Sequence, residues 1–382
     1  MPRKPSLEDA IVKPVVFERQ LYERLSQMAQ KRGSSISALV RELLKKSLEA
    51  PPAALPAEET AEKVPENVLL EVAEEVARYT EEEFQSGGKI KPIQYPGGDY
   101  HIFKELNEIF MQAPPHIQAF VEVFGGSCHC ALNISRERFK IIVCNDIDSL
   151  LINLYRYMKE EPEALIRQLA LIPYSREVHA VMKSIIGDPS ADPLTKAVAA
   201  FYLIRSSMNA ILSESGSFRH AKNPVKRTSR AKSMAHAIAA LKEYAKKFRD
   251  VALENLDYRD IIRKYDTPHT LFYLDPPYVS TGRIERESYY RHAFSIHDLR
   301  AMANLLRTIK GVFVLKISED NYFFIKGILP QHEAVILEKA NWMEKTVGEE
   351  RAPIRMVIAH NVKQGKQDSE ASLERWLAHE AH

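Results

Sequence analysis

Cysteine is scarce in this chain of 382 residues, which contains only Cys128, Cys130 and Cys144. A small, odd number argues against a disulfide scaffold and is typical of proteins from a reducing compartment. Long apolar segments are also missing, because no run approaches the roughly 18–20 residues that a membrane-spanning helix needs. The first residues lead into no apolar core of a signal peptide. We therefore expect a soluble, cytoplasmic protein without a membrane partner.

Metal-binding patterns are equally sparse. The segment Cys128-His129-Cys130 places two thiols one residue apart, and no second pair of ligands with zinc spacing occurs in the sequence. We expect these cysteines to pack in the core and predict no metal site. A phosphate-binding loop is disfavoured as well, because no Gly-Lys-Ser/Thr follows the glycine pair Gly125-Gly126.

Charge is unevenly distributed, although the formal net charge is only +2. Residues 51–86 hold ten Glu and two basic residues, whereas 217–250 hold ten Lys or Arg and two acids. A basic surface of this kind predicts contact with nucleic-acid phosphates, and a solvated helix face or loop is the plain alternative. The part of it that contains no acid carries Arg219, Lys222, Lys226, Arg227, Arg230 and Lys232.

Composition divides the chain into segments with different expected structures. Proline, alanine and glutamate dominate the segment after residue 50, which is typical of a linker. Apolar residues at helical spacing dominate residues 149–249, and the polar C-terminal segment shows neither pattern. We expect a small N-terminal unit at 1–50 and an acidic linker at 51–87. An α/β domain in two pieces, 88–148 and 250–362, follows, with a helical insertion at 149–249 between them and a polar tail at 363–382.

Apolar runs in the two α/β pieces are candidate strands. Most of these runs are continuous rather than alternating, as expected where helices cover both faces of a sheet. We therefore expect an α/β fold. The candidate strands are 120–124, 140–145, 250–254, 271–275, 311–317, 334–338 and 354–360.

Two of these strands end in residues suited to a nucleoside. Phe124-Gly125-Gly126-Ser127 follows the first strand, and glycines at such a place let a ligand approach the backbone closely. About 20 residues later, Asp146 ends the second strand, where an acid can bind ribose hydroxyls. This pair alone is compatible with any nucleotide.

The most informative motif is Asp275-Pro276-Pro277-Tyr278, which follows the apolar run 271–274. A carboxylate and a prolyl carbonyl can accept the two N–H bonds of an exocyclic amine, and the prolines donate no competing N–H. A tyrosine offers a face on which an extruded base can stack. An Asp-Pro turn that merely closes an α/β strand is the alternative.

Taken together, the motifs resemble those of the Dam-like, D12 class DNA adenine N6-methyltransferases over about residues 90–362. The resemblance implies a Rossmann-like sheet that binds S-adenosyl-L-methionine, a target-recognition insertion at 149–249, and direct in-line methyl transfer to a flipped adenine of double-stranded DNA. It implies catalytic roles for Asp275, Pro276, Pro277 and Tyr278. It also implies a cofactor site made by Tyr95, Pro96, Gly97, Gly98, Phe124, Gly125, Gly126, Ser127, Asp146 and Asp257.

Two departures from the family pattern stand out. Asp99 follows Gly98 where the family usually has a lysine, and Cys128 stands where it usually has a further glycine. We expect a side chain at position 128 to crowd the cofactor turn. A DNA-binding regulator that has lost methyltransferase activity is therefore a second hypothesis. An RNA or cytosine-N4 methyltransferase is disfavoured by Asp275, because the cytosine-N4 relatives usually begin this motif with Ser.

Residues 12–49 resemble a ribbon-helix-helix domain, with a short strand at 15–17, a first helix up to Gly33 and a second helix capped by Ser35. Such a short unit normally forms an intertwined dimer, so we expect a homodimer. The outward side chains of the strand cannot hydrogen-bond base edges, which favours dimerisation over base reading. A plain helical hairpin is the alternative.

Overall fold

The structure is a computed structural model that describes the α/β part and the helical insertion. The described residues are 30–31, 93, 99–208, 212, 216–219, 230–279, 291–339 and 354–363. The unit expected at 12–49 lies outside them apart from Gln30 and Lys31, and so does the linker. None of the described helices is long and apolar enough to cross a membrane.

Within the described residues, one sheet of seven strands forms the centre of the α/β part. Its order is β3-β2-β1-β4-β5-β7-β6, with β1 to β5 parallel and β7 antiparallel to both of its neighbours. All of the expected strands are confirmed, and their ends differ from expectation by at most two residues. The strands are β1 (Ala119–Glu122), β2 (Ile141–Asn145), β3 (Val251–Glu254), β4 (Thr270–Leu274), β5 (Val312–Ser318), β6 (Glu333–Lys339) and β7 (Ile354–His360).

Strand β1 lies between β2 and β4, so the order of the strands reverses at this point of the sheet. Ligands of open α/β sheets bind beyond the carboxyl ends of the strands at such a reversal. Because β1 to β5 are parallel, the residues that follow them gather at one edge of the sheet. This edge is where the glycine turn, Asp146 and the Asp-Pro-Pro-Tyr turn lie.

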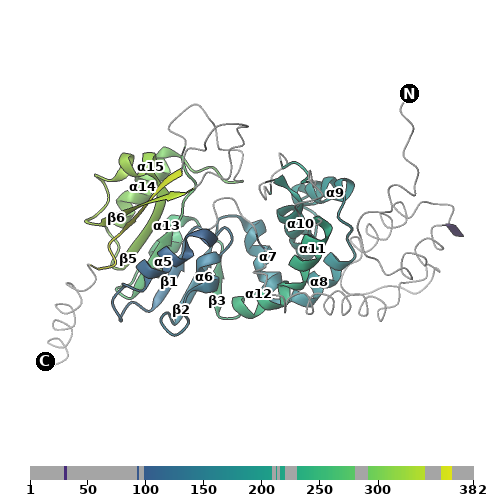
Figure 1. The fold of residues 1–382 in the computed structure, drawn as a ribbon, viewed down its shortest axis with the longest axis horizontal. Helices are drawn as coiled ribbons and strands as arrows, with labels where there is room; N and C mark the ends of the chain where they lie inside the picture. The colour runs from purple at the N-terminus through teal and green to yellow at the C-terminus, as the bar shows by residue number, and fades with distance from the viewer. Residues whose placement is uncertain are drawn as a thin grey trace.

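Apolar side chains alternate between the two faces of the sheet, and helices cover both faces (Figure 1). On β4, Leu271 and Tyr273 pack into one core, while Phe272 and Leu274 pack into the other. This two-sided arrangement confirms the Rossmann-like α/β fold. The first core includes α5 (Phe103–Phe110) and α6 (His129–Asn133), and the second includes α13 (Tyr258–Tyr265), α14 (Ile296–Leu306) and α15 (Glu319–Ile325).

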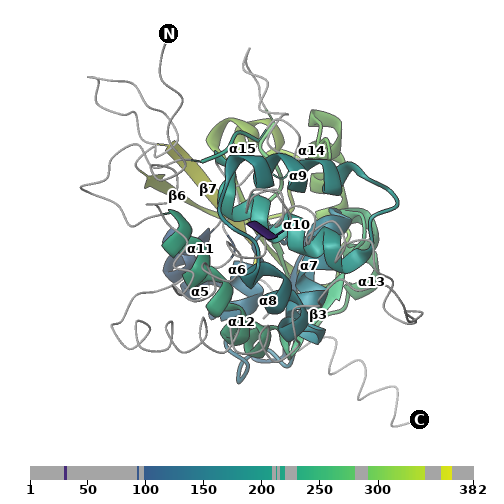
Figure 2. The ribbon, with the colours of Figure 1, turned by 90° about the vertical axis from the view of Figure 1, so that its right-hand side faces the viewer.

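The helices between β2 and β3 form a lobe beside the sheet (Figure 1). Several begin with a side-chain cap, as where Asp148 accepts a hydrogen bond from the amide of Leu150. Helix α10 is apolar nearly all round and lies in the middle of the lobe (Figure 2). The lobe contains α7 (Ser149–Glu160), α8 (Pro162–Ala170), α9 (Arg176–Gly187), α10 (Pro193–Ser206), α11 (Arg230–Ala239) and α12 (Leu241–Phe248).

Candidate active site

The predicted glycine turn and the predicted ribose-binding acid contact each other. The Gly126 amide donates to Asp146 Oδ2 at 2.8 Å, and the Gly125 amide donates to the carbonyl of Asn145 at 2.6 Å. Asp146 also accepts from the amide of Asp148 at 2.8 Å. Burial raises the pKa of Asp146 to about 6, although these amide hydrogen bonds act in the opposite direction.

The glycine turn is closely packed against β2. A Cβ atom at Gly125 would lie 2.6 Å from Cys144 Sγ and 2.8 Å from the Asn145 carbonyl oxygen, so only glycine fits. Gly126 has a φ of 48°. Cys128 has a φ of 50°, a left-handed conformation that costs an ordinary residue about 1–2 kcal/mol. This backbone conformation explains why a glycine suits the position that Cys128 occupies.

The side chain of Cys128 lies against the glycine turn. Its thiol is buried, as expected for a packing residue, and forms a disulfide with Cys144 of β2, a pair that the sequence did not predict. Its Sγ lies 3.3 Å from the place of a Cβ atom at Gly125, and Cys128 does not line the neighbouring pocket. The expectation that this side chain crowds the cofactor turn stays a prediction. Cys130 is a free, buried cysteine and packs in the core as predicted.

Asn145 holds the ends of three strands together. Its Nδ2 donates to the carbonyls of Val123, at 2.8 Å, and Leu256, at 3.0 Å. Its Oδ1 accepts from the Leu256 amide at 2.9 Å. The residues that follow β1, β2 and β3 thus keep a constant spacing at this edge.

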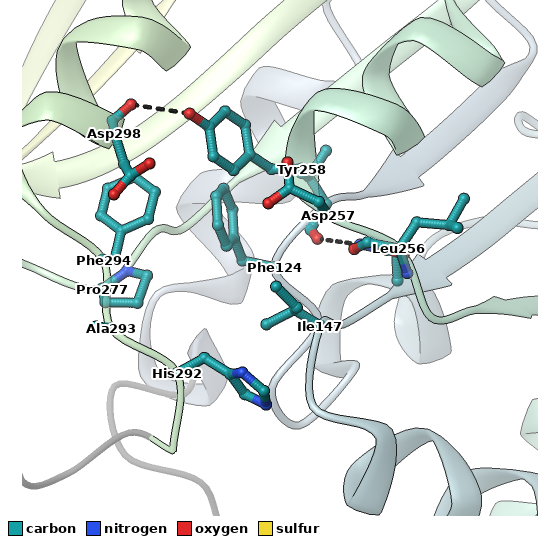
Figure 3. A pocket seen from close by; sticks show the side chains of 12 residues that line it. Phe124, Ile147, Leu256, Asp257, Tyr258, Pro277, His292, Ala293, Phe294 and Asp298 are labelled. Atoms are coloured by element: carbon teal, nitrogen blue, oxygen red, sulfur yellow. Dashed lines mark hydrogen bonds between the residues drawn. The ribbon is translucent and has the colours of Figure 1, made fainter.

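A pocket opens where these strand ends meet (Figure 3). Its aromatic side includes Phe124 and Tyr258, whose rings stack with centroids 5.9 Å apart, and Phe294, which meets Phe124 edge-on. Asp257 and Asp298 are the acids of the wall, and both are half-buried. Asp257 also caps α13 by accepting from the Arg259 amide at 2.9 Å. The remaining lining comes from Val123, Asn145, Ile147, Leu256, Pro277, His292 and Ala293. A mostly apolar pocket with few polar groups is typical of a site for a small organic ligand.

The Asp-Pro-Pro-Tyr turn reaches this pocket from β4. Pro277 lines the pocket, and Asp275 precedes it by two residues. The carboxylate of Asp275 is 18% exposed and pairs with Lys316 Nζ at 2.6 Å. Burial raises the pKa of Asp275 to about 7, with the Lys316 ammonium opposing the shift and the charge of Asp99 adding to it.

The predicted DNA-contacting residues lie partly within the described chain. Arg219 and Arg230 come from the two ends of an undescribed stretch and both lie near Arg205 of α10. Burial lowers the pKa of Arg205 to about 10, and the charges of Arg219 and Arg230 lower it further. The backbone of Lys232 lies in α11. Tyr95, Pro96, Gly97, Gly98, Lys222, Lys226 and Arg227 lie outside the described residues.

Sequence reasoning missed Lys316 and Arg205. Lys316 is the only charged residue within the strand Val312–Ser318, and a lysine inside an apolar run was a signal for a buried ion pair. Arg205 carries a weaker signal, since it ends an apolar helix.

Known proteins provide an independent comparison. The sequence model of the D12 class N6 adenine-specific DNA methyltransferases matches residues 95–343. A type II methyltransferase of Lactococcus lactis subsp. cremoris, M1.LlaDCHI, is 26% identical over 221 residues, which make up 53% of this chain and 76% of that protein. A DNA adenine methylase of Vibrio cholerae is 24% identical over 238 residues, or 60% of this chain and 80% of that protein.

A third relative, the modification methylase StsI of Streptococcus sanguinis, is 29% identical over 79 residues. The chain spans only 11% of the length of StsI, and the match covers 20% of this chain. The family match is much longer and includes the glycine turn, the insertion and the Asp-Pro-Pro-Tyr turn. Because that match extends over more than half of its residues, the chain belongs to the D12 class of N6 adenine-specific DNA methyltransferases.

Proposed function

We propose that this protein transfers the methyl group of S-adenosyl-L-methionine to the N6 amine of an adenine in double-stranded DNA, by direct in-line transfer to a flipped base. The observation that carries the proposal is the meeting of two motifs at one pocket. Pro277 of the Asp-Pro-Pro-Tyr turn lines the same pocket as Phe124 of the glycine turn. A methyl donor held by one motif would therefore lie beside an amine held by the other.

The residues of the pocket, together with Asp146 between the lining residues Asn145 and Ile147, fit the nucleoside part of S-adenosyl-L-methionine. The apolar wall of Phe124, Ile147 and Tyr258 suits a purine ring, and the Asp257 carboxylate can accept from the purine's amine. Each carboxylate oxygen of Asp146 accepts one backbone hydrogen bond and keeps a lone pair for a ribose hydroxyl. The cofactor would supply an electrophilic methyl group. By the family resemblance, Tyr95, Pro96, Gly97 and Gly98 complete the site.

Asp275 and its neighbours would hold the target amine. The Asp275 carboxylate and the Pro276 carbonyl would accept the two N–H bonds, which directs the nitrogen lone pair towards the methyl group. Tyr278 would stack on the flipped base, worth about 1–3 kcal/mol, against an extrusion cost of a few kcal/mol. Holding the reacting atoms in line supplies much of the acceleration in such a transfer. The proposal gives no role to a metal.

The helical lobe and the N-terminal unit would serve the DNA partner. Arg219 and Arg230 belong to the insertion beside the sheet, and we assign them contacts with DNA phosphates. We assign the lobe a role in target recognition and residues 12–49 a role in forming a homodimer. A chromosomal or plasmid DNA substrate would place the reaction in the cytoplasm.

The test is quantitation of N6-methyladenine by mass spectrometry in DNA from a methylation-free host that expresses the full chain. Wild-type protein should produce the modified base, and Asp275→Ala should abolish it. Asp320→Ala, an exposed aspartate on α15, is the matched control and should behave as wild type. Folded wild-type protein that produces no N6-methyladenine would instead support the DNA-binding regulator.

A further inference from the structure

We infer that Lys316 is a positioning residue of the methyl transfer, because its ammonium group, anchored by Asp99, holds the carboxylate of Asp275 in the orientation that accepts the target amine. The inference rests on the proposed function and deepens it. It adds Lys316 of β5 and Asp99 of the 3-10 helix η1 (Asp99–His101) to the site, although no sequence motif links these residues to Asp275.

The register of the sheet brings Lys316 to the catalytic turn. Strands β4 and β5 are parallel, with Leu274 opposite Leu315, so the next positions, Asp275 and Lys316, are neighbours. Side chains alternate along a strand. Val314 and Lys316 therefore share one face of β5, as Tyr273 and Asp275 share the same face of β4.

A lysine in this place is costly unless it is paired. Its side chain is only 3% exposed, and an isolated ammonium in such surroundings would lose its hydration without compensation. Lys316 Nζ donates to Asp275 Oδ2 at 2.6 Å and forms a second buried ion pair with Asp99 Oδ1. The burial of this lysine is thus balanced by two carboxylates, one of which is the predicted catalytic group.

Asp99 is itself held in place. Its Oδ2 accepts from the Tyr273 hydroxyl at 2.6 Å and from the Cys130 thiol at 3.7 Å, while Oδ1 accepts from Lys316. Asp99 is 5% exposed. An anchor with both oxygens engaged leaves Lys316 little freedom to turn away from Asp275. The position where the family usually has a lysine thus holds an acid here, and β5 supplies the lysine.

The ion pair leaves one oxygen of Asp275 for chemistry. Oδ2 is engaged by Lys316, and within the described residues Oδ1 accepts no hydrogen bond. Fixing Oδ2 fixes the plane of the carboxylate and hence the direction of the lone pairs on Oδ1. An accepting oxygen that is already oriented costs no reorganisation when the amine arrives.

The charges around Asp275 predict opposite effects of two substitutions. Lys316 faces it from β5 and Asp99 from η1, while Glu122, Cys130, Tyr273 and Tyr278 are the other titratable groups near this cluster. Removing the ammonium raises the pKa of Asp275, whereas removing the Asp99 charge lowers it. A residue that only filled space would produce neither shift.

The experiment measures single-turnover methyl transfer by the full chain, from radiolabelled S-adenosyl-L-methionine to plasmid DNA of a methylation-free host, between about pH 5.5 and about pH 9. Lys316→Met should slow transfer about 10²-fold and move the acidic limb of the profile to higher pH. Asp99→Asn should move that limb to lower pH. Lys310→Met is the matched control, since Lys310 is exposed and precedes the opposite end of β5.

Three results would overturn the inference. Lys316→Met could transfer methyl groups as fast as Lys310→Met, the acidic limb of the profile could stay in place in both Lys316→Met and Asp99→Asn, or it could move in the same direction in both. Thermal melts check that each variant folds. If Lys316→Met does not fold, the direction in which the acidic limb moves in Asp99→Asn decides the matter. Asp275→Ala separates this inference from the proposed function. If Asp275→Ala transfers methyl groups as fast as wild type, the proposed function is wrong. If Asp275→Ala loses transfer while Lys316→Met keeps it, only the role of Lys316 is wrong.

Discussion

Replacement of Gly125 by alanine tests whether close packing of the glycine turn is needed for both folding and cofactor binding. The added Cβ would lie 2.6 Å from Cys144 Sγ and 2.8 Å from the Asn145 carbonyl oxygen. One of these contacts is with backbone, which cannot rotate away as a flexible side chain can. The turn must therefore move away from β2, and the hydrogen bond from the Gly125 amide to Asn145 must lengthen from 2.6 Å.

Overpacking of this kind costs about 1–3 kcal/mol, which lowers the melting temperature by roughly 2–12 °C in a domain of this size. Because the Gly126 amide donates to Asp146, a displaced turn also displaces this acid, for which we propose a role in ribose binding. Loss of one charge-assisted hydrogen bond, about 1.5 kcal/mol, weakens S-adenosyl-L-methionine binding about tenfold. Urea unfolding and isothermal titration calorimetry measure the two effects.

Gly327→Ala is the matched control, because a Cβ atom at Gly327 would meet nothing within 4 Å. Its free energy of unfolding should stay within about 0.5 kcal/mol of wild type, with unchanged cofactor affinity. If Gly125→Ala behaves like Gly327→Ala in both measurements, the turn does not depend on its contact with β2, and the reasoning is refuted.

Other predictions concern the acid, the basic residues and the N-terminal unit. Since the pKa of Asp146 is raised to about 6, its carboxylate becomes protonated as the pH falls through that value, and the cofactor affinity of the wild-type protein should decline below about pH 6. Asp146→Asn should bind the cofactor about tenfold more weakly at pH 8 and show no such decline. A pH dependence that the substitution leaves unchanged would contradict this. The double replacement of Arg227 and Arg230 by alanine should reduce the slope of log DNA affinity against log salt by about two, and an unchanged slope would exclude phosphate contacts there. Leu43 lies in the helix expected after Ser35, at a position with the helical spacing of apolar residues, so Leu43→Glu should convert a dimer to a monomer in sedimentation. A dimer that persists in this variant would show that residues 12–49 do not form the interface.

Much of the fold was predictable because its signals are local. Buried parallel strands appear as continuous apolar runs, which is why strands such as Thr270–Leu274 were found to within two residues. Glycine turns and Asp-Pro turns also occupy a few consecutive positions. The glycine turn, Asp146 and the Asp-Pro-Pro-Tyr turn could be named in this way, since each directly follows a strand or its last residue.

What the sequence by itself determined was the α/β class, the place of the glycine turn and of the Asp-Pro-Pro-Tyr turn at strand ends, and the membership of the D12 class. Only the tertiary structure decided which distant side chains meet. The ion pair of Lys316 with Asp99 joins residues 217 positions apart, and its partner Asp275 lies 41 positions away. Alternation along a strand is a local property, but which strands are neighbours depends on the order of the whole sheet. The same holds for the Cys128–Cys144 disulfide, which exists because the glycine turn folds back on β2.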